Sequence, residues 1–180
     1  VLRRQKIRES VLELLRRYKP SIVGLSAMSF QFDTSLKIAQ LIKAENKDIK
    51  TVLGGYHATL LYDEISGSDS AEFFDFLVRG EGDLSFNELL DAYEKKQGIN
   101  NILGISYKVN GKFIHNNPRP LENLGDIRLP ARSKRVYRGY TYYGFTLDIV
   151  ETSRGCTMPC NFCSIDKINA KSFRENSIYR

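Results

Sequence analysis

The sequence contains only three cysteines, two histidines, no tryptophan and no long run of apolar residues. Its apolar runs are too short to span a bilayer, and its first residues have neither the apolar core nor the cleavage site of a signal peptide. We therefore expect a cytoplasmic protein without a membrane span. In that compartment, an odd number of clustered cysteines argues against a disulfide framework and favours a metal or redox site.

Composition and charge exclude several other classes. The 180 residues are 42% hydrophobic and 27% charged, as in a folded globular chain, and the length suits one ordinary domain plus a remnant of another. The net charge of +6 comes largely from basic clusters in the first helix and in residues 128–144. The second cluster interleaves Arg and Lys with Tyr, which would suit stacking on nucleic acid, but no nucleic-acid-binding motif accompanies it. We interpret it as an interdomain linker.

The hydrophobic pattern alternates between strands and helices over the first hundred residues. Continuous apolar runs over 21–28, 50–55 and 74–80 predict buried parallel strands. Helices are expected over 2–18, from Asp33 or Thr34, over 58–65 and from Asp83. Within residues 104–116, Asn110-Gly111 is a strong hairpin signal.

This order of elements predicts an α/β fold, a doubly wound, flavodoxin- or Rossmann-like, mostly parallel sheet with helices on both faces. A doubly wound unit begins with a strand before its first helix, so we expect the sheet to lack its first strand. We place this domain at residues 1–100, a hairpin and Tyr-rich linker at 101–148, and the start of a further domain at 149–180.

Three predicted strands end in residues suited to binding a ligand, because ligands of open α/β sheets lie beyond the carboxyl ends of the strands. These segments are Ser26-Ala27-Met28, Gly54-Gly55-Tyr56-His57 and Arg79-Gly80-Glu81-Gly82. Paired glycines let a flat ligand approach the backbone, and helix N-termini offer free N–H groups. The alternative is that the glycines only turn strand into helix. His57 could bind a cofactor metal, although its place at a helix start favours a local hydrogen bond.

All three cysteines lie within eight residues, at Cys156, Cys160 and Cys163. Structural zinc requires four ligands, so a zinc site here would need Asp166, a distant histidine or residues beyond the end of the chain. A four-iron cluster held by three thiolates instead leaves one iron free to bind a substrate or cofactor. The missing fourth cysteine therefore favours an iron–sulfur cluster over zinc.

At this CxxxCxxC spacing, the sequence resembles the radical S-adenosylmethionine (radical SAM) superfamily, and Ser153-Arg154-Gly155 matches the way such segments open. The resemblance implies that the three cysteines hold a [4Fe–4S] cluster whose fourth iron binds S-adenosylmethionine. It places Phe162 near the adenine. It also implies an electron donor such as flavodoxin or ferredoxin.

Upstream, VGLSAMS, LGGYHAT and VRGEGD resemble the cobalamin-binding domain of the B12-dependent radical SAM branch. That resemblance assigns Ser26, Gly54 and Gly55 to the cleft for the nucleotide tail of cobalamin. The further candidate cofactor-binding residues are Met28, His57, Gly80, Glu81 and Gly82.

The sequence departs from these families at two places. The Asp-x-His-x-x-Gly segment of other cobalamin proteins does not occur, and its expected position precedes Val1. The chain also ends 17 residues after Cys163 (180 − 163), so only the start of a radical SAM barrel is expected, and the chain alone should be inactive.

We expect the N-terminal part of an enzyme that transfers a methyl group to an unactivated carbon of a small-molecule substrate through a 5′-deoxyadenosyl radical. No residue stands out as a general base. The same cofactors in a ring-forming or oxidative cyclase are the alternative. A tRNA methylthiotransferase would need three further cysteines. Two further alternatives are not enzymes: a corrinoid or nucleotide sensor, and a zinc-stabilised RNA-binding module.

Overall fold

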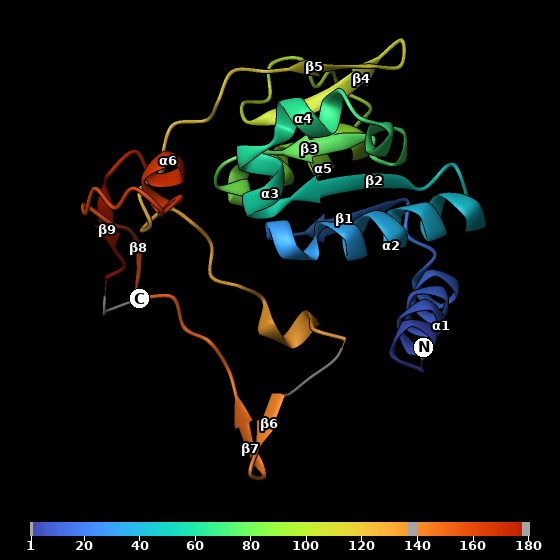
Figure 1. Ribbon diagram of the computed structural model, residues 1–180, viewed down its shortest axis with the longest axis horizontal. Helices are drawn as coiled ribbons and strands as arrows, with labels where there is room; N and C mark the ends of the chain where they lie inside the picture. The colour runs from blue at the N-terminus through green and yellow to red at the C-terminus, as the bar shows by residue number, and fades with distance from the viewer. Residues whose placement is uncertain (1, 137–139, 178–180) are drawn as a thin grey trace. The chain divides into compact units, whose positions relative to one another are not determined.

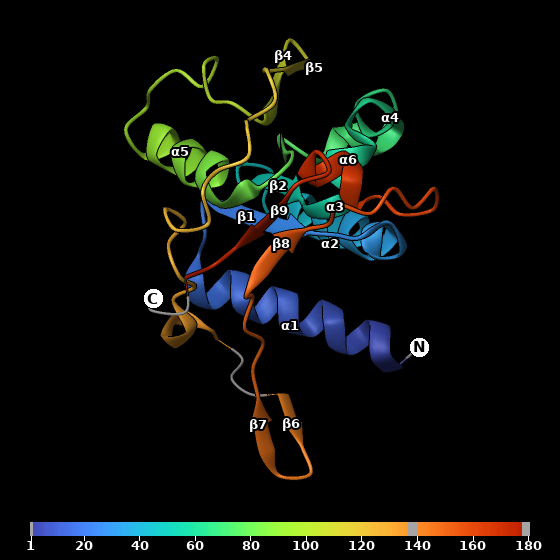
Figure 2. The same ribbon diagram turned by 90° about the vertical axis from the view of Figure 1, so that its left-hand side faces the viewer.

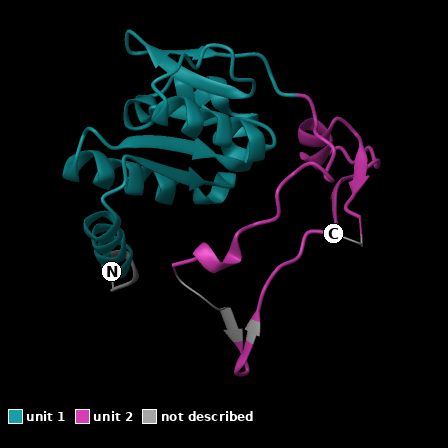
Figure 3. Ribbon diagram, turned by 180° about the vertical axis from the view of Figure 1, so that it is seen from behind, with its two compact units in different colours: residues 1–119 teal, residues 120–180 magenta. Residues whose placement is uncertain are grey.

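The computed structural model describes residues 2–136 and 140–177 (Figure 1). The chain divides into two compact units, residues 1–119 and 120–180 (Figure 3). The predicted Tyr-rich linker falls in the second unit, and its residues 137–139 lie outside the described part of the chain. No helix in the described ranges is long and apolar enough to cross a membrane.

The first unit is built on a mixed sheet of five strands in the order β1-β2-β3-β4-β5. The strands are β1 (Ile22–Ser26), β2 (Lys50–Gly54), β3 (Phe76–Val78), β4 (Ile105–Val109) and β5 (Lys112–His115). The first three are parallel, whereas β4 is antiparallel to β3 and β5 to β4. The predicted α/β class and the parallel pairing of the first three strands are confirmed.

Helices cover both faces of this sheet. The helices are α1 (Leu2–Tyr18), α2 (Phe32–Glu45), α3 (Gly55–Leu60), α4 (Tyr62–Ser66) and α5 (Gly82–Glu94), with 3-10 turns η1 (Ser29–Gln31) and η2 (Asp69–Phe73). Figure 2 shows α5 on one side of the sheet and α2, α3 and α4 on the other. Helix α1 packs against α2, where its buried Leu12 and Leu15 form an apolar cluster with Ile42.

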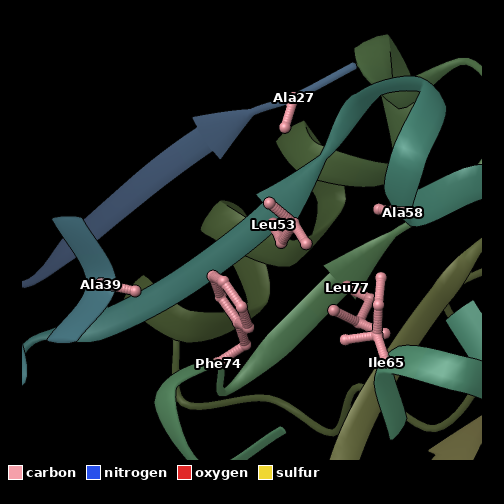
Figure 4. Packing of buried hydrophobic residues seen from close by; sticks show 7 residues of the cluster. All are labelled: Ala27, Ala39, Leu53, Ala58, Ile65, Phe74 and Leu77. Atoms are coloured by element: carbon pink, nitrogen blue, oxygen red, sulfur yellow. The ribbon is translucent and has the colours of Figure 1, made fainter. Parts of the chain in front are cut away.

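Alternation along the strands divides the core into two layers. On one face, Leu53 and Leu77 pack with Phe74 and with residues of α2, α3 and α4 (Figure 4). On the other face, Val52 and Val78 pack against α5. Because neighbouring residues of a strand point to opposite faces, a continuous apolar run is what a strand covered on both sides requires.

The predicted hairpin is confirmed, but its place in the fold differs from our expectation. Asn110 and Gly111 have φ of 51° and 79°, as a two-residue hairpin turn requires. Strand β4 pairs with β3, so the hairpin extends the sheet and is not part of a linker. The first unit accordingly continues to Arg119, whose Nε donates to Ser85 Oγ of α5 over 2.9 Å.

Three helices begin at other residues than we predicted. Helix α2 begins at Phe32, after the 3-10 turn, and not at a cap formed by Asp33 or Thr34. Helix α3 begins at Gly55, directly after β2, and α5 begins at Gly82, after the three-residue turn 79–81 that follows β3. Both glycines therefore lie in the first turn of a helix.

In its described residues, 120–136 and 140–177, the second unit contains two short strand pairs, one α-helix and one 3-10 turn. Its elements are η3 (Arg132–Lys134), β6 (Tyr140–Tyr142), β7 (Phe145–Leu147), β8 (Ser153–Gly155), α6 (Ile165–Asn169) and β9 (Phe173–Glu175). Strand β8 pairs with β9 in an antiparallel manner, and Gly155 stands opposite Phe173. The segment that carries the cysteines therefore leaves β8 and returns through α6 to β9.

Candidate functional site

The carboxyl ends of β1, β2 and β3 lie side by side, as the sequence predicted. Ser26 is in register with Gly54, and a Cβ at Gly54 would lie 3.8 Å from the carbonyl oxygen of Val78. The structure thus brings the three candidate segments to one edge of the sheet.

The turns after β1 and β2 are joined through their backbones. The Ala27 N–H donates to the Gly54 carbonyl and the His57 N–H to the Ala27 carbonyl, each over 3.0 Å. Gly55 has φ +85°, and a Cβ there would lie 2.8 Å from Ser26 Oγ and 2.9 Å from Ala27 N. The protein's own packing therefore requires glycine at position 55, before any ligand is considered.

The turn after β3 is open by comparison. Gly80 has φ +73°, and a Cβ there would meet no atom within 4 Å. Glu81 is the N-cap of α5, and a Cβ at Gly82, the first helical residue, would lie 3.2 Å from the Val78 side chain. Free space over a left-handed glycine beside a helix N-terminus leaves backbone accessible to a ligand.

Large apolar side chains are exposed around this edge. Met28 is 46% exposed, Tyr56 38%, and Phe30, in the 3-10 turn after β1, 79%. Exposed apolar side chains grouped in this way are typical of a surface that receives a ligand or another part of the protein. The sequence analysis did not single out Phe30; its only signal is an aromatic residue just after a buried strand.

His57 lies beneath the edge and forms local contacts. It is 9% exposed, its ring stacks on Phe32 with centroids 4.1 Å apart, and its Nδ1 lies 3.2 Å from Ser29 Oγ. Burial lowers the pKa of the imidazole, against the opposing charges of Glu64 and Asp33. A neutral ring packed in this way supports the interpretation that His57 forms local hydrogen bonds.

The cysteines lie on the segment between β8 and α6. All three are partly exposed, Cys163 N–H donates to the Cys160 carbonyl over 3.1 Å, and Met158 N–H donates to Cys156 Sγ over 3.4 Å. Phe162 is 94% exposed. Within residues 2–136 and 140–177, no three Cys, His, Asp or Glu side chains are arranged to hold a metal ion.

The packing of β8 against the returning chain requires glycine at position 155. It has φ +93°, and a Cβ there would lie 1.9 Å from the Ser172 carbonyl oxygen. Any side chain would therefore separate β8 from the chain that returns to β9. Because Gly155 is fixed in this strand pair, Cys156, which follows it directly, has a defined starting position.

The residues present are compatible with the cofactors that the sequence implies. The open backbone at Gly80 and the apolar rim of Met28, Phe30 and Tyr56 suit a large, flat, partly apolar ligand such as cobalamin. Three cysteine thiols, partly exposed on one short segment, have the donor chemistry of an iron–sulfur cluster.

Comparison with known proteins finds a family match within the first unit. Residues 2–90 match the family of the B12 binding domain. An uncharacterized methyltransferase of Pyrococcus horikoshii is 34% identical over 94% of this chain, which covers 37% of that protein. An anaerobic magnesium-protoporphyrin IX monomethyl ester cyclase of Rubrivivax gelatinosus is 31% identical over 87% of this chain, which covers 29% of it.

A solved structure shows the same fold over nearly the whole chain. The radical S-adenosylmethionine methyltransferase TsrM from Kitasatospora setae, with tryptophan and a SAM analogue bound, superposes with a TM-score of 0.70 over 99% of this chain and 36% of its own, at 16% identity. The chain thus spans 37% of the methyltransferase, 29% of the cyclase and 36% of the TsrM chain. Residues 2–90 thus match the B12 binding domain, in a chain similar in sequence to parts of a methyltransferase and a cyclase and similar in fold to part of TsrM.

Proposed function

We propose that the protein containing this chain is a cobalamin-dependent radical SAM enzyme that transfers a methyl group to an unactivated carbon of a small-molecule substrate. The observation that carries the proposal is the presence, in one chain, of a B12 binding domain over residues 2–90 and of the Cys156-x-x-x-Cys160-x-x-Cys163 spacing. Similarity to a methyltransferase over 94% of the chain supports it.

In this proposal the carboxyl edge of the sheet binds cobalamin. Ser26, Gly54 and Gly55 line the cleft for the nucleotide tail. The remaining candidates, Met28, His57, Gly80, Glu81 and Gly82, shape the surroundings of the cleft through their backbone or their packing. When bound, cobalamin supplies a carrier for a methyl group.

The second unit binds the cluster and S-adenosylmethionine in this proposal. Cys156, Cys160 and Cys163 hold a [4Fe–4S] cluster, and Phe162 lies near the adenine. When bound, the cluster and S-adenosylmethionine supply a 5′-deoxyadenosyl radical. An electron donor such as flavodoxin or ferredoxin in the cytoplasm reduces the cluster.

The products of S-adenosylmethionine test the reaction type. Methyl transfer consumes it in two ways, leaving S-adenosylhomocysteine where it donates a methyl group and 5′-deoxyadenosine where it yields the radical. We expect both products by mass spectrometry when the anaerobically reconstituted protein receives S-adenosylmethionine and a reductant. Cys160→Ala should abolish 5′-deoxyadenosine, since two thiolates hold a cluster poorly.

A cyclase is the second candidate, because a cyclase is 31% identical over 87% of the chain. A cyclase would release 5′-deoxyadenosine without S-adenosylhomocysteine. Detection of 5′-deoxyadenosine alone would therefore favour ring formation over methyl transfer. Neither product, with the cluster present, would contradict both proposals.

A further inference from the structure

A single hydroxyl group joins the two glycine turns at the carboxyl edge of the sheet. Thr59 lies in α3, one helical turn after Gly55, and its Oγ1 donates to the Gly55 carbonyl over 2.9 Å. The same oxygen accepts the N–H of Gly80 over 3.0 Å. A hydroxyl has one proton to donate and two lone pairs to accept with, so both bonds are compatible.

The two turns differ in how they are otherwise held. The turn after β2 is fixed by β1, because Ala27 bonds to Gly54 and His57. The turn after β3 has Arg79 on one side, whose N–H donates to the Gly104 carbonyl over 2.7 Å. On its other side Gly80 projects into open space, so the bond to Thr59 holds the exposed part of this turn.

Arg79 adds rigidity on the inner side of the same turn. Its side chain is buried, Nη2 donates to the Ile105 carbonyl over 3.2 Å and to the Asn116 carbonyl, and the guanidinium lies 4.6 Å from the centre of the Tyr62 ring. Arg79 thus ties the end of β3 to the hairpin. Thr59 ties the next residue, Gly80, to α3, so these adjacent residues are held by two different elements.

We propose that Thr59 is a positioning residue of the cleft, whose hydroxyl holds the Gly80 turn against the Gly55 turn and so keeps both in the shape that binds the ligand. The inference rests on the proposed function, in which this edge binds cobalamin. It assigns to Thr59 a role that acts through two glycines, without contact between Thr59 and the ligand.

The test compares Thr59→Val, which removes the hydroxyl at nearly constant volume, with Thr59→Ser, which retains it. Ser66→Ala is the matched control, because Ser66 Oγ makes the same bond to the carbonyl one helical turn before it, that of Tyr62, over 2.6 Å. The readouts on the whole chain are hydrogen exchange of the Gly80 amide by NMR and the dissociation constant of hydroxocobalamin by absorbance titration.

We expect Thr59→Val to accelerate Gly80 exchange about tenfold and to raise the dissociation constant about fivefold, as loss of one hydrogen bond would. Thr59→Ser and Ser66→Ala should stay within about twofold of the unaltered chain. In the unaltered chain, Gly80 should already exchange at least about tenfold more slowly than an unstructured glycine, a result independent of how well any variant folds.

Four results would overturn the inference. Unprotected Gly80 exchange in the unaltered chain, or exchange unaffected by Thr59→Val, would show that the bridge does not form in solution. Faster exchange with an unchanged dissociation constant would show that the bridge does not shape the cleft. If the unaltered chain binds no hydroxocobalamin, the proposed function fails and the role of Thr59 in binding fails with it, while the exchange data still decide whether the bridge exists.

Discussion

At the scale of single residues, one carboxylate organises the amino end of the sheet. Asp75 Oδ2 accepts hydrogen bonds from Lys43 Nζ over 2.6 Å and from Thr51 N over 2.8 Å. Lys50 Nζ lies 3.5 Å from Oδ1. Burial disfavours the charged form of Asp75, but the hydrogen bonds from Lys43 and Thr51 and the charges of Lys43 and Lys50 together outweigh it, so the pKa of the carboxyl lies below its ordinary value.

Asp75→Asn should therefore destabilise the first unit. It removes the charge that Lys43 and Thr51 are bonded to, and we expect a loss of about 2 kcal/mol in the free energy of unfolding, measured by urea titration. The control is Asp91→Asn, because Asp91 forms only an exposed pair with Lys95 at 3.5 Å and should change stability little. Equal effects of the two substitutions would contradict the role of Asp75.

The two histidines and Asp75 predict a loss of stability in acid. Burial lowers the pKa of His57, and burial together with the charge of Arg79 lowers the pKa of His115, both from 6.5. Below 6.5 the unfolded chain therefore takes up protons that the folded chain resists, so stability is full above that pH and falls as pH drops toward the folded values. Asp75 adds a second loss below its ordinary pKa of 3.8.

Unfolding measured from about pH 7.5 to about pH 5 should show this decline, and His115→Gln should make it shallower. His115 is the better choice of the two histidines because it lies outside the candidate cleft. Its Nδ1 lies 2.8 Å from Ser106 Oγ, on the neighbouring strand β4. An unchanged slope in His115→Gln would mean that His115 has the same pKa in both states.

At the scale of elements, the glycines divide into those that the protein's own packing requires and those that face open space. Gly55→Ala would place a Cβ within 2.9 Å of Ser26 and Ala27 at φ +85°, whereas Gly80→Ala meets no atom within 4 Å at φ +73°. We expect a loss of about 3 kcal/mol for Gly55→Ala from crowding and strain, and about 1 kcal/mol for Gly80→Ala from strain alone. Thermal unfolding of the two variants decides this; losses of equal size would argue against the close contact at Gly55.

The second unit provides a second pair of glycines, Gly155 in β8 and Gly144 in the turn between β6 and β7. A Cβ at Gly155 would lie 1.9 Å from the Ser172 carbonyl oxygen, whereas one at Gly144, also with positive φ, would meet no atom within 4 Å. Gly155→Ala should separate β8 from β9 and reduce the iron bound after anaerobic reconstitution to less than about half, while Gly144→Ala should bind iron normally. Full iron binding by Gly155→Ala would show that the strand pair does not position the cysteines.

The sequence predicted most elements because their patterns are local, and it failed where tertiary contacts decide. The run over 74–80 was predicted as a strand, but β3 spans only Phe76–Val78. Phe74 is apolar because it is buried in the core, although it precedes the strand. The Asn110-Gly111 turn was predictable from two residues, whereas pairing of β4 with β3 was not, since no local signal names a partner strand.

The candidate site was predictable to a similar extent. Ser26, Gly54 and Gly80 could be placed at one edge because parallel strands end together. Thr59 could not be assigned, because its bond within α3 is a common local feature and only the fold brings Gly80 to the same oxygen.

At the scale of the whole molecule, the two units carry the parts of one proposed reaction. The first matches the B12 binding domain, and the second carries all three cysteines. Because the chain covers 37% of the methyltransferase it resembles, the substrate and the complete reaction belong to the proposal and not to the fold.

The most direct test of this account is elemental analysis of the protein, purified anaerobically from cells grown with cobalamin. We predict about one cobalt and about four irons per chain, with little zinc. Iron without cobalt would contradict the assignment of the cleft to cobalamin. Zinc in place of iron would contradict the radical mechanism itself.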